Sequence, residues 1–493
     1  MAAGDGSGRG RPSRVRVVTA LAAGIATLAA AAILGASGPG AANDSGATAL
    51  AGSSSPGTAG TSAAASDAAA ALGVRQTVAA TFTFPGAAPQ LAWPARGQAA
   101  LSVVGLGSLG GSGPADSPVP IASIAKTMTA YLVLQDHPLA DGQNGPTITV
   151  SAGDAAVYQK EAATTEDSLV PVQAGEQLTE RDALYALMLS SADNVAQILA
   201  AWDAGSVPAF LTRMNTTAAE IGMTHTVFTD PSGLDAATMS TAQDLVALGE
   251  TVMQWDDFRR LVSTRWAIIP VAGLIRNYDG LLGMDGVIGI KTGSTNEAGS
   301  CLLFAASVTV GGQAVTLVGA VLGQYLGSGR TLLTSAMQAA GALVVSGEQA
   351  LGTATVAAPG TEVAAVERGG TRVGALTVAA PLTVIGWPGL RYRVSVVSGG
   401  APGQVTQPSG GPSPTAGSGA SPSGSPNPNE NPSPRATKTA EAGPPADAIA
   451  AIVLVTVVDP SAAAAGPLTD AGSLPAALQP LRPSAPAPGG RTG

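Results

Sequence analysis

Cysteine and histidine are nearly absent from this chain of 493 residues, which has one cysteine and two histidines. The single cysteine, Cys301, lies in the apolar stretch GSCLLFAA, which is typical of a buried strand. A chain with one cysteine cannot form an intrachain disulfide, and it cannot supply a set of thiolates to hold a structural metal ion. We therefore interpret Cys301 as a small core side chain.

Positive charge is also scarce. The chain has 24 lysines and arginines against 33 aspartates and glutamates, which gives a formal net charge of -9. Apart from the N-terminus, the basic residues are scattered, with no basic stripe and no alternation with aromatic residues of the kind that binds nucleic acids. The sequence therefore predicts no nucleic-acid partner.

The N-terminus carries the main cluster of positive charge. Four arginines between residues 9 and 16 precede an apolar, alanine-rich run over residues 17–36. This pattern predicts an export signal, with a length between that of a signal-peptide core and that of a single anchor helix. The positive-inside rule leaves the arginines in the cytoplasm and places the rest of the chain outside. We expect an extracytoplasmic protein of the cell envelope, anchored in the cytoplasmic membrane by this helix, and its cleavage stays open.

Composition divides the chain into segments. Stretches dominated by Ala, Gly, Ser, Thr and Pro cannot bury enough apolar surface to fold and predict a tether and an insertion. The predicted segments are a cytoplasmic Arg-rich segment (1–16), a signal or anchor helix (17–36), a disordered tether (37–73), a main domain (74–348), a small β-rich module (349–400 and 446–482), a disordered insertion (401–445) and a disordered tail (483–493).

The main domain mixes strand and helix patterns. The stretch AALSVVGLG near Ala99 predicts a strand, and a helix is predicted from Ser123 onward. Two long apolar runs, SCLLFAASVTV and QAVTLVGAVLG, flank Gly311 and Gly312 and predict a hairpin. The pattern indicates an α/β fold.

Lysine occurs only four times, as Lys126, Lys160, Lys291 and Lys438. Lys126 follows Ser123 by three residues within PIASIAKTMTA, which predicts a buried helix. A buried ammonium needs a partner or gives up its proton, so this amine needs a structural or a chemical reason. Downstream, Lys291 opens the run Lys-Thr-Gly, and Ser191 lies between two helical runs in ALMLSSADNVAQ. The order SxxK, SxN or SDN, and KTG is a signature of penicillin-binding proteins and class A β-lactamases.

These residues suit acyl transfer. A serine at the start of a buried helix has its hydroxyl beside free backbone N–H groups and the positive end of the helix dipole, which favours an oxyanion. Lys126, one turn along, reaches that hydroxyl, so we predict Ser123 as the nucleophile and a neutral Lys126 as the base. Lys291 is predicted to keep its charge, to disfavour the charged form of Lys126 by repulsion, and to attract a substrate carboxylate, with a hydrogen bond from Thr292.

The stretch from about Trp93 to Gln324 resembles the D-alanyl-D-alanine carboxypeptidases, the low-molecular-mass serine penicillin-binding proteins. It carries, in the family's order and approximate spacing, PIASIAKTMTAY, LMLSSADNVA, HTVFTDPSGL, STAQDL, NYDGLLGMDGVIGIKTGST and AGSCLLFAA. The resemblance covers about half of the chain. It implies a β-lactamase/DD-peptidase-like domain, an antiparallel sheet with helices on both faces and a helical subdomain. It also implies a peptidoglycan stem peptide as substrate, β-lactams as covalent inhibitors, and no metal or organic cofactor.

The resemblance also implies residue roles. The backbone N–H groups of Ser123 and Ser294 would form the oxyanion hole, and Ser191 would relay a proton to the departing D-alanine. Lys291, Thr292, Gly293 and Ser294 would together bind the substrate. We interpret the turn from Asp230 to Leu234, DPSGL, as structural.

The chain departs from the family at one position. The family usually has Ser-x-Asn, but this sequence has Ser191, Ala192 and Asp193, with Asn194 next. An amide can donate to a substrate carbonyl, whereas an ionised carboxylate only accepts and would favour the ammonium form of Lys126. We include both Asp193 and Asn194 among the candidate substrate-binding residues, and Asn194 could take over the donor role.

Three other functions remain open. A β-lactamase of class A uses a glutamate between the SxN and KTG motifs, where this chain has only Glu220 and Glu250. A non-catalytic envelope protein that binds wall peptides is a second alternative. Endopeptidase or transpeptidase action differs from carboxypeptidase action mainly in the group that leaves or accepts, which these motifs do not distinguish.

Overall fold

The computed structural model describes residues 72–164, 167–325, 332–399, 450–458 and 482–483. Four predicted segments lie wholly or almost wholly outside the described residues: the cytoplasmic segment, the signal or anchor helix, the tether and the insertion at 401–445. The tail beyond 483 lies outside them too. Every described residue belongs to one compact unit, Asp67–Gly493. Within the described ranges, no helix combines the length and apolar character needed to cross a membrane.

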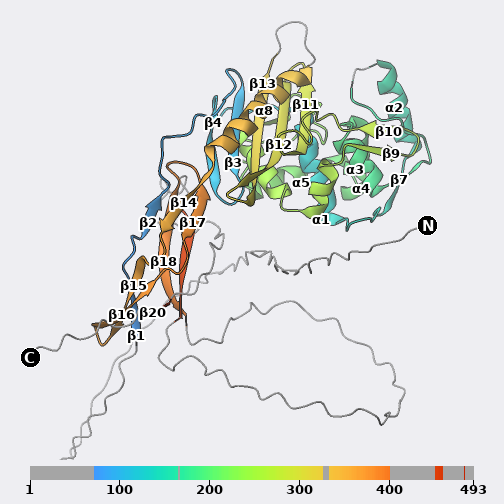
Figure 1. Cartoon of the computed structure of the whole chain (residues 1–493). Coiled ribbons are helices and arrows are strands. Elements are labelled where there is room, and N and C mark those ends of the chain that lie inside the picture. The colour runs from blue at the N-terminus through green and yellow to red at the C-terminus, as the bar shows by residue number, and fades with distance from the viewer. Residues whose placement is uncertain (1–71, 165–166, 326–331, 400–449, 459–481, 484–493) are drawn as a thin grey trace, which may run out of the picture. The chain divides into compact units, whose positions relative to one another are not determined.

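A five-stranded antiparallel sheet is the centre of the main domain (Figure 1). Its strands, in spatial order, are β11 (Val287–Thr295), β12 (Gly299–Val310), β13 (Gln313–Gln324), β3 (Gln98–Val103) and β4 (Gly107–Ser112). Strands β12 and β13 form the predicted hairpin, because Gly311 and Gly312 both have positive φ angles and close a two-residue turn.

Both faces of this sheet are covered by helices. Along β12, Leu303 and Ala305 belong to one core, and the alternate residues Leu302 and Phe304 belong to another. The first core includes residues of α6 (Ala242–Val252), whose Gly249 lets the helix approach Val318 closely. The second includes the buried side of α8 (Leu332–Ala350), which lies across the sheet in Figure 1. The fold is therefore the predicted α/β arrangement.

A helical group packs into the first core. Its members are η1 (Ala122–Ala125), α1 (Lys126–Asp136), α3 (Glu180–Met188), α4 (Asp193–Ala204), α5 (Val207–Glu220) and α7 (Asp256–Val262), and α2 (Ala152–Thr164) contacts α4. Local sequence fixes their ends: Thr179 forms a capping box with Asp182 at the start of α3, and Gly205 ends α4 with φ 75°. Every residue of α1 from Lys126 to Leu134 is buried, as predicted for a core helix.

Short strand pairs connect these elements. They are β5 (Val119–Pro120) with β8 (Met239–Ser240), β6 (Thr147–Thr149) with β7 (Gln177–Thr179), and β9 (Trp266–Ile269) with β10 (Gly273–Arg276).

The β-rich module begins earlier in the chain than predicted. Its strands are β1 (Leu72–Gln76), β2 (Thr81–Thr83), β14 (Gly352–Ala357), β15 (Glu362–Arg368), β16 (Thr371–Thr377), β17 (Leu382–Gly386), β18 (Arg391–Gly399), β19 (Ala450–Val457) and β20 (Arg482–Pro483). Because β1 pairs with β15 and β2 with β18, residues 72–83 belong to these sheets, and the predicted domain boundary at 74 needs correction. Their partners lie far along the chain, so no local pattern could reveal the pairing. Strand β19 pairs with β18, so the segment between them joins two neighbouring strands.

Candidate active site

Ser123 lies in the short helix η1, which leads directly into α1. The preceding residue, Ala122, has φ 47°, a conformation that a residue with a side chain rarely adopts. Two glycines make this turn possible by close backbone contact. A Cβ at Gly233 would overlap the Ala122 carbonyl oxygen, and one at Gly293 would lie 3.0 Å from the Ile121 oxygen and 3.1 Å from the Ser123 nitrogen. The turn is thus fixed from two sides, and Ser123 itself stays half-exposed.

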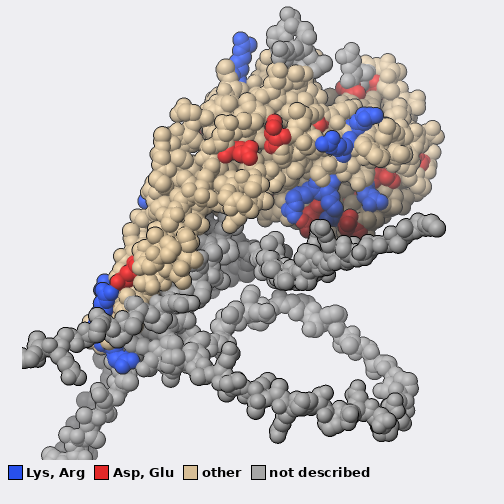
Figure 2. Space-filling view, in the orientation of Figure 1, with Lys and Arg blue, Asp and Glu red and all other residues tan. Residues whose placement is uncertain are grey.

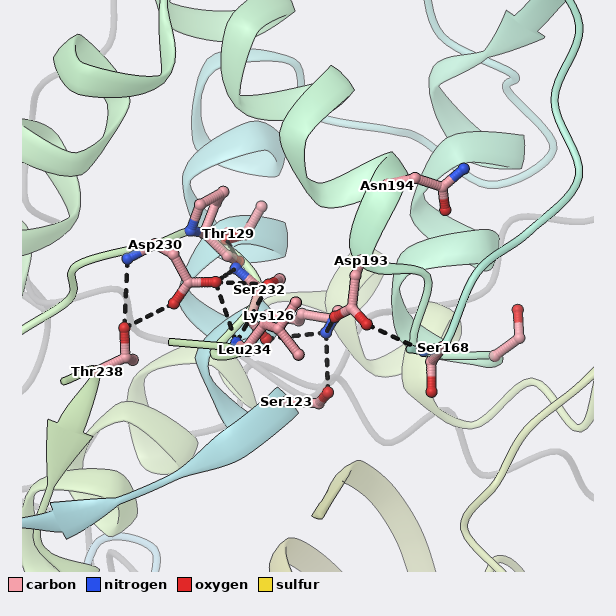
Figure 3. Close-up of polar contacts among 12 residues, drawn as sticks. Ser123, Lys126, Thr129, Ser168, Asp193, Asn194, Asp230, Ser232, Leu234 and Thr238 are labelled. Atoms are coloured by element: carbon pink, nitrogen blue, oxygen red, sulfur yellow. Dashed lines mark hydrogen bonds and ion pairs between the residues drawn. The ribbon is translucent and has the colours of Figure 1, made fainter. Parts of the chain in front are cut away.

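Lys126 points from the first turn of α1 to three acceptors (Figure 3). Its Nζ lies 2.8 Å from Ser123 Oγ, 2.6 Å from Asp193 Oδ1 and 2.8 Å from the Ser232 carbonyl oxygen. The Lys126 side chain is completely buried. An ammonium has three protons to donate, so all three are used in this arrangement, and the predicted contact between Ser123 and Lys126 is present.

Asp193 is the buried ionic partner of Lys126. It is the first residue of α4, where its backbone N–H donates to the Ser168 carbonyl at 2.7 Å. Its Oδ2 accepts from the Ser168 N–H at 3.1 Å, while Oδ1 accepts from Lys126. The departure from the family's Ser-x-Asn therefore places a carboxylate against the candidate base.

The DPSGL turn, which the sequence indicates is structural, also contacts Lys126. Asp230 Oδ2 accepts from the N–H groups of Ser232 and Leu234, which fixes the turn. The Ser232 carbonyl then points at Lys126 Nζ, and Thr129 Oγ1 donates to the Pro231 carbonyl at 2.6 Å. The sequence does not show which backbone carbonyl will contact a side chain. The glycine of the turn was the one local indication of a close contact, because only a residue without a Cβ, here Gly233, lets the turn touch Ala122.

The predicted KTG residues lie on β11 beside Ser123. Lys291 and Thr292 are buried, Gly293 contacts the η1 turn as described, and Ser294 at the next position is half-exposed. The Lys291 Nζ donates to the Thr292 carbonyl at 2.9 Å. The structure therefore brings Ser123, Lys126, Asp193 and the KTG strand together in one place.

Lys291 differs electrostatically from the prediction. Burial, and secondly the nearby charge of Lys126, lower the pKa of Lys291 to about 7, while Asp193 and Asp279 oppose the change. Burial therefore disfavours the charged form of Lys291, which the sequence predicted to keep its charge. Asp279 is 5% exposed, and burial raises its pKa, opposed by a backbone hydrogen bond and by Lys291. No local pattern in the sequence places Asp279 near Lys291, so its interaction with this lysine becomes visible only in the fold.

Two predicted residues are placed differently from the rest. Ser191 sits in the turn between α3 and α4 with φ 64°, and no hydrogen bond joins it to Ser123 or Lys126 in the part of the chain that the structure describes. The Asn194 amide accepts from the Val170 N–H at 3.1 Å and donates to the Val170 carbonyl at 2.9 Å. It points away from Lys126 (Figure 3), so this arrangement does not favour the alternative in which Asn194 takes over the donor role.

The site offers no obvious place for a metal. Over the described ranges, no group of three or more His, Cys, Asp or Glu residues is arranged to hold an ion. Cys301 is fully buried, and this burial raises the pKa of its thiol to about 12. The arrangement suits nucleophilic chemistry by a serine with a lysine beside it.

Comparison with known proteins gives consistent results. The family model for D-alanyl-D-alanine carboxypeptidases, peptidase S11, matches residues 111–324. A D-alanyl-D-alanine carboxypeptidase of Streptomyces sp. (strain K15) is 32% identical over 225 residues, which cover 42% of this chain and 74% of that protein.

Two D-alanyl-D-alanine endopeptidases are similar over a smaller share of their length. That of Pseudomonas aeruginosa is 31% identical over 205 residues (39% of this chain, 61% of that protein). That of Escherichia coli (strain K12) is 32% identical over 191 residues (37% of this chain, 58% of that protein). The crystal structure of the Streptomyces K15 DD-transpeptidase is 28% identical with a TM-score of 0.43, covering 54% of this chain and 99% of that chain.

Proposed function

The chain belongs to the D-alanyl-D-alanine carboxypeptidase family of serine peptidases, and we propose that it trims peptidoglycan stem peptides through an acyl-enzyme on Ser123. The observation that supports this most directly is the 2.8 Å contact between Lys126 Nζ and the half-exposed Ser123 Oγ. A serine is a weak nucleophile unless a base takes its proton, and a lysine in its neutral form can do so.

The proposed reaction begins once Lys126 has lost a proton. Ser123 Oγ attacks the carbonyl of the penultimate D-alanine and passes its proton to Lys126 Nζ. The backbone N–H groups of Ser123 and Ser294 stabilise the oxyanion. The C–N bond then breaks, the terminal D-alanine leaves with the proton from Lys126, and water later hydrolyses the acyl-enzyme. The family resemblance implies Ser191 as the relay of this proton, although no hydrogen bond joins it to Lys126 in the described part of the chain.

Lys291 and Thr292 are the proposed anchors of the substrate's terminal carboxylate. Lys291 belongs to the strand whose Gly293 contacts the turn that carries Ser123, so a carboxylate held there is close to the attacked bond. A bound anion also favours the charged form of Lys291, so binding draws a proton onto this lysine. A penicillin, with an amide and a carboxylate, is expected to acylate Ser123 covalently.

A class A β-lactamase would need one of the two glutamates between the SxN and KTG motifs, but one is hydrogen-bonded to another residue and the other is exposed at the end of a helix. Glu250 Oε1 accepts a hydrogen bond from Ser102 Oγ at 2.6 Å, and Glu220 is exposed in the last turn of α5. Neither contacts Ser123 or Lys126, which favours a peptidase over a class A β-lactamase.

Endopeptidase action is a second candidate, because two of the similar proteins are D-alanyl-D-alanine endopeptidases. The same acyl transfer would apply, with a leaving amine that belongs to a second peptide.

The deciding experiment incubates the purified protein with a diacylated stem peptide that ends in D-Ala-D-Ala and measures free D-alanine. A cross-linked peptide dimer tests the endopeptidase alternative in parallel. The variant Ser123→Ala should release none, whereas Ser263→Ala, an exposed serine after α7, should match the parent. Release that persists in Ser123→Ala would contradict the proposal, and no release from either substrate by the parent would favour a binding protein without activity.

We also propose that the domain works outside the cytoplasmic membrane, on the basis of the N-terminal arginines and apolar run. Protease added to intact protoplasts should degrade the part of the chain after residue 74. Complete protection until the membrane is permeabilised would contradict export.

A further inference from the structure

The hairpin of β9 and β10 carries large apolar side chains on both faces. Ala267, Ile269 and Ile275 point inward and are buried. On the outer face, Trp266 is 58% exposed, Ile268 71% and Leu274 53%. A sheet with one face in water usually presents polar residues on that face, so this pattern is unexpected.

The exposed apolar side chains are contiguous. Ile268 lies directly opposite Leu274 in the antiparallel register, and Trp266 lies opposite Arg276. The turn between the strands adds Val271, which is 47% exposed and has φ 55°. A β-branched residue rarely adopts this conformation, so the tip presents an apolar side chain on a strained backbone. We name these four residues, Trp266, Ile268, Val271 and Leu274, the apolar hairpin face.

Two exposed arginines lie at the base of the hairpin. Arg276 ends β10 on the outer face, two residues after Leu274, whereas Arg265 precedes β9 and its guanidinium lies beside Gly283. Neither forms an ion pair with an acidic residue in the described part of the chain, although the chain as a whole has a net charge of -9. In Figure 2, the surface in the region of β9 and β10 is mostly tan, with blue and red side chains beside it.

We propose that the apolar hairpin face docks on the surface of an anionic lipid bilayer. Contiguous exposed apolar side chains mark interaction sites, and a tip of Val, Ile and Leu with a tryptophan and arginines behind it matches the layers of a bilayer surface. The apolar tip enters the acyl boundary, the indole of Trp266 lies at headgroup level, and the long arginine side chains reach the phosphates. The positive charges complement anionic headgroups, whereas an apolar protein partner would not need them.

The docking has a consequence for the site. The chain leaves β10 through Asn277 to Tyr278, whose N–H donates to the Leu189 carbonyl at 3.0 Å, two residues before Ser191. A hairpin held at a bilayer therefore holds this edge of the site near the membrane surface. This part of the inference rests on the proposed extracytoplasmic location and on the proposed site.

Trp266 offers a direct readout, because the other four tryptophans, at 93, 202, 255 and 387, are half-buried or buried. The full-length protein is mixed with vesicles whose acyl chains carry bromine, which quenches tryptophan on contact. One set contains equal amounts of phosphatidylglycerol and phosphatidylcholine, the other phosphatidylcholine alone. Trp266→Phe supplies the background of the other four residues. We expect the Trp266 emission to fall about twofold or more in the anionic vesicles and much less in the neutral ones.

Variants separate the contributions of charge and apolar contact. The double variant R265Q/R276Q should lose most of the quenching in anionic vesicles, and so should I268S/L274S. Val373 is an exposed apolar residue of the β module, and in Val373→Ser the Trp266 emission should be quenched as much as in the parent. No quenching of Trp266, equal quenching in both kinds of vesicle, or quenching that survives R265Q/R276Q would overturn the proposal. Self-association in sedimentation that I268S/L274S abolishes would instead assign the face to a second copy of the chain.

Penicillin acylation, measured without vesicles, distinguishes a failure of the docking proposal from a failure of the proposed function. The hairpin variants should acylate at the parent's rate, which also shows that they fold. If the parent fails to acylate but Trp266 is quenched, the proposed function fails and the docking stands.

Discussion

Replacing Lys291 by methionine should stabilise the fold while destroying the site. Burial and Lys126 lower the pKa of Lys291 from 10.5 to about 7. The folded protein therefore releases this proton at a lower pH than the unfolded chain does. Between these two values the unfolded state binds more protons, so stability rises with pH, and the full penalty applies at and below pH 7.

The size of the penalty follows from the difference between the two pKa values. At about 1.4 kcal/mol per unit, the difference amounts to roughly 5 kcal/mol at most. The methionine variant also loses the hydrogen bond from Lys291 Nζ to the Thr292 carbonyl, which is worth about 1 kcal/mol. We therefore expect Lys291→Met to be more stable by about 2–4 kcal/mol at pH 6, with the gain shrinking toward pH 10.

Urea unfolding at pH 6, 7, 8 and 9, followed by tryptophan fluorescence, measures this difference. Lys160→Met, an exposed lysine in α2, is the control and should change stability little at any pH. Acylation by penicillin should be lost in Lys291→Met alone. A destabilised Lys291→Met at pH 6, or a gain that does not change with pH, would refute the reasoning.

Three further variants test single contacts. Asp193→Asn removes the ion-pair partner that Lys126 Nζ contacts at 2.6 Å, and Lys126 must be neutral to act as the base, so penicillin acylation should be faster than in the parent; a slower rate would contradict this role. Asn194→Ala leaves the backbone groups of Val170 without partners, which should cost about 1–3 kcal/mol in urea unfolding and leave the acylation rate of the folded protein unchanged. Gly293→Ala pushes a methyl group against the turn that holds Ser123, so the rate of penicillin acylation should fall about tenfold or more. A rate equal to that of the parent would contradict this.

Local patterns in the sequence predicted much of the scaffold. The apolar run around Lys126 predicted a core helix, the paired glycines at 311 and 312 predicted the hairpin, and the SxxK and KTG spacing predicted which lysines lie near Ser123. Each of these features could be predicted because it depends on a few neighbouring residues or on motifs that follow a known order.

The remaining features depend on contacts between distant segments. The Ser232 carbonyl reaches Lys126 only because the DPSGL turn folds against Ala122, and the strands at residues 72–83 are defined by partners in the β module. The direction of the Asn194 amide depends on Val170, which lies in a loop with no pattern of its own. The lowered pKa of Lys291 depends on complete burial, which cannot be recognised before the fold is known.

The central claim is that Ser123 is the nucleophile of an acyl transfer. Incubation with benzylpenicillin, followed by intact-protein mass measurement and peptide mapping, tests it most directly. We predict one covalent adduct, located on a peptide that contains Ile121 to Lys126, and no adduct in Ser123→Ala. An adduct on another peptide, or one that persists in Ser123→Ala, would contradict the account.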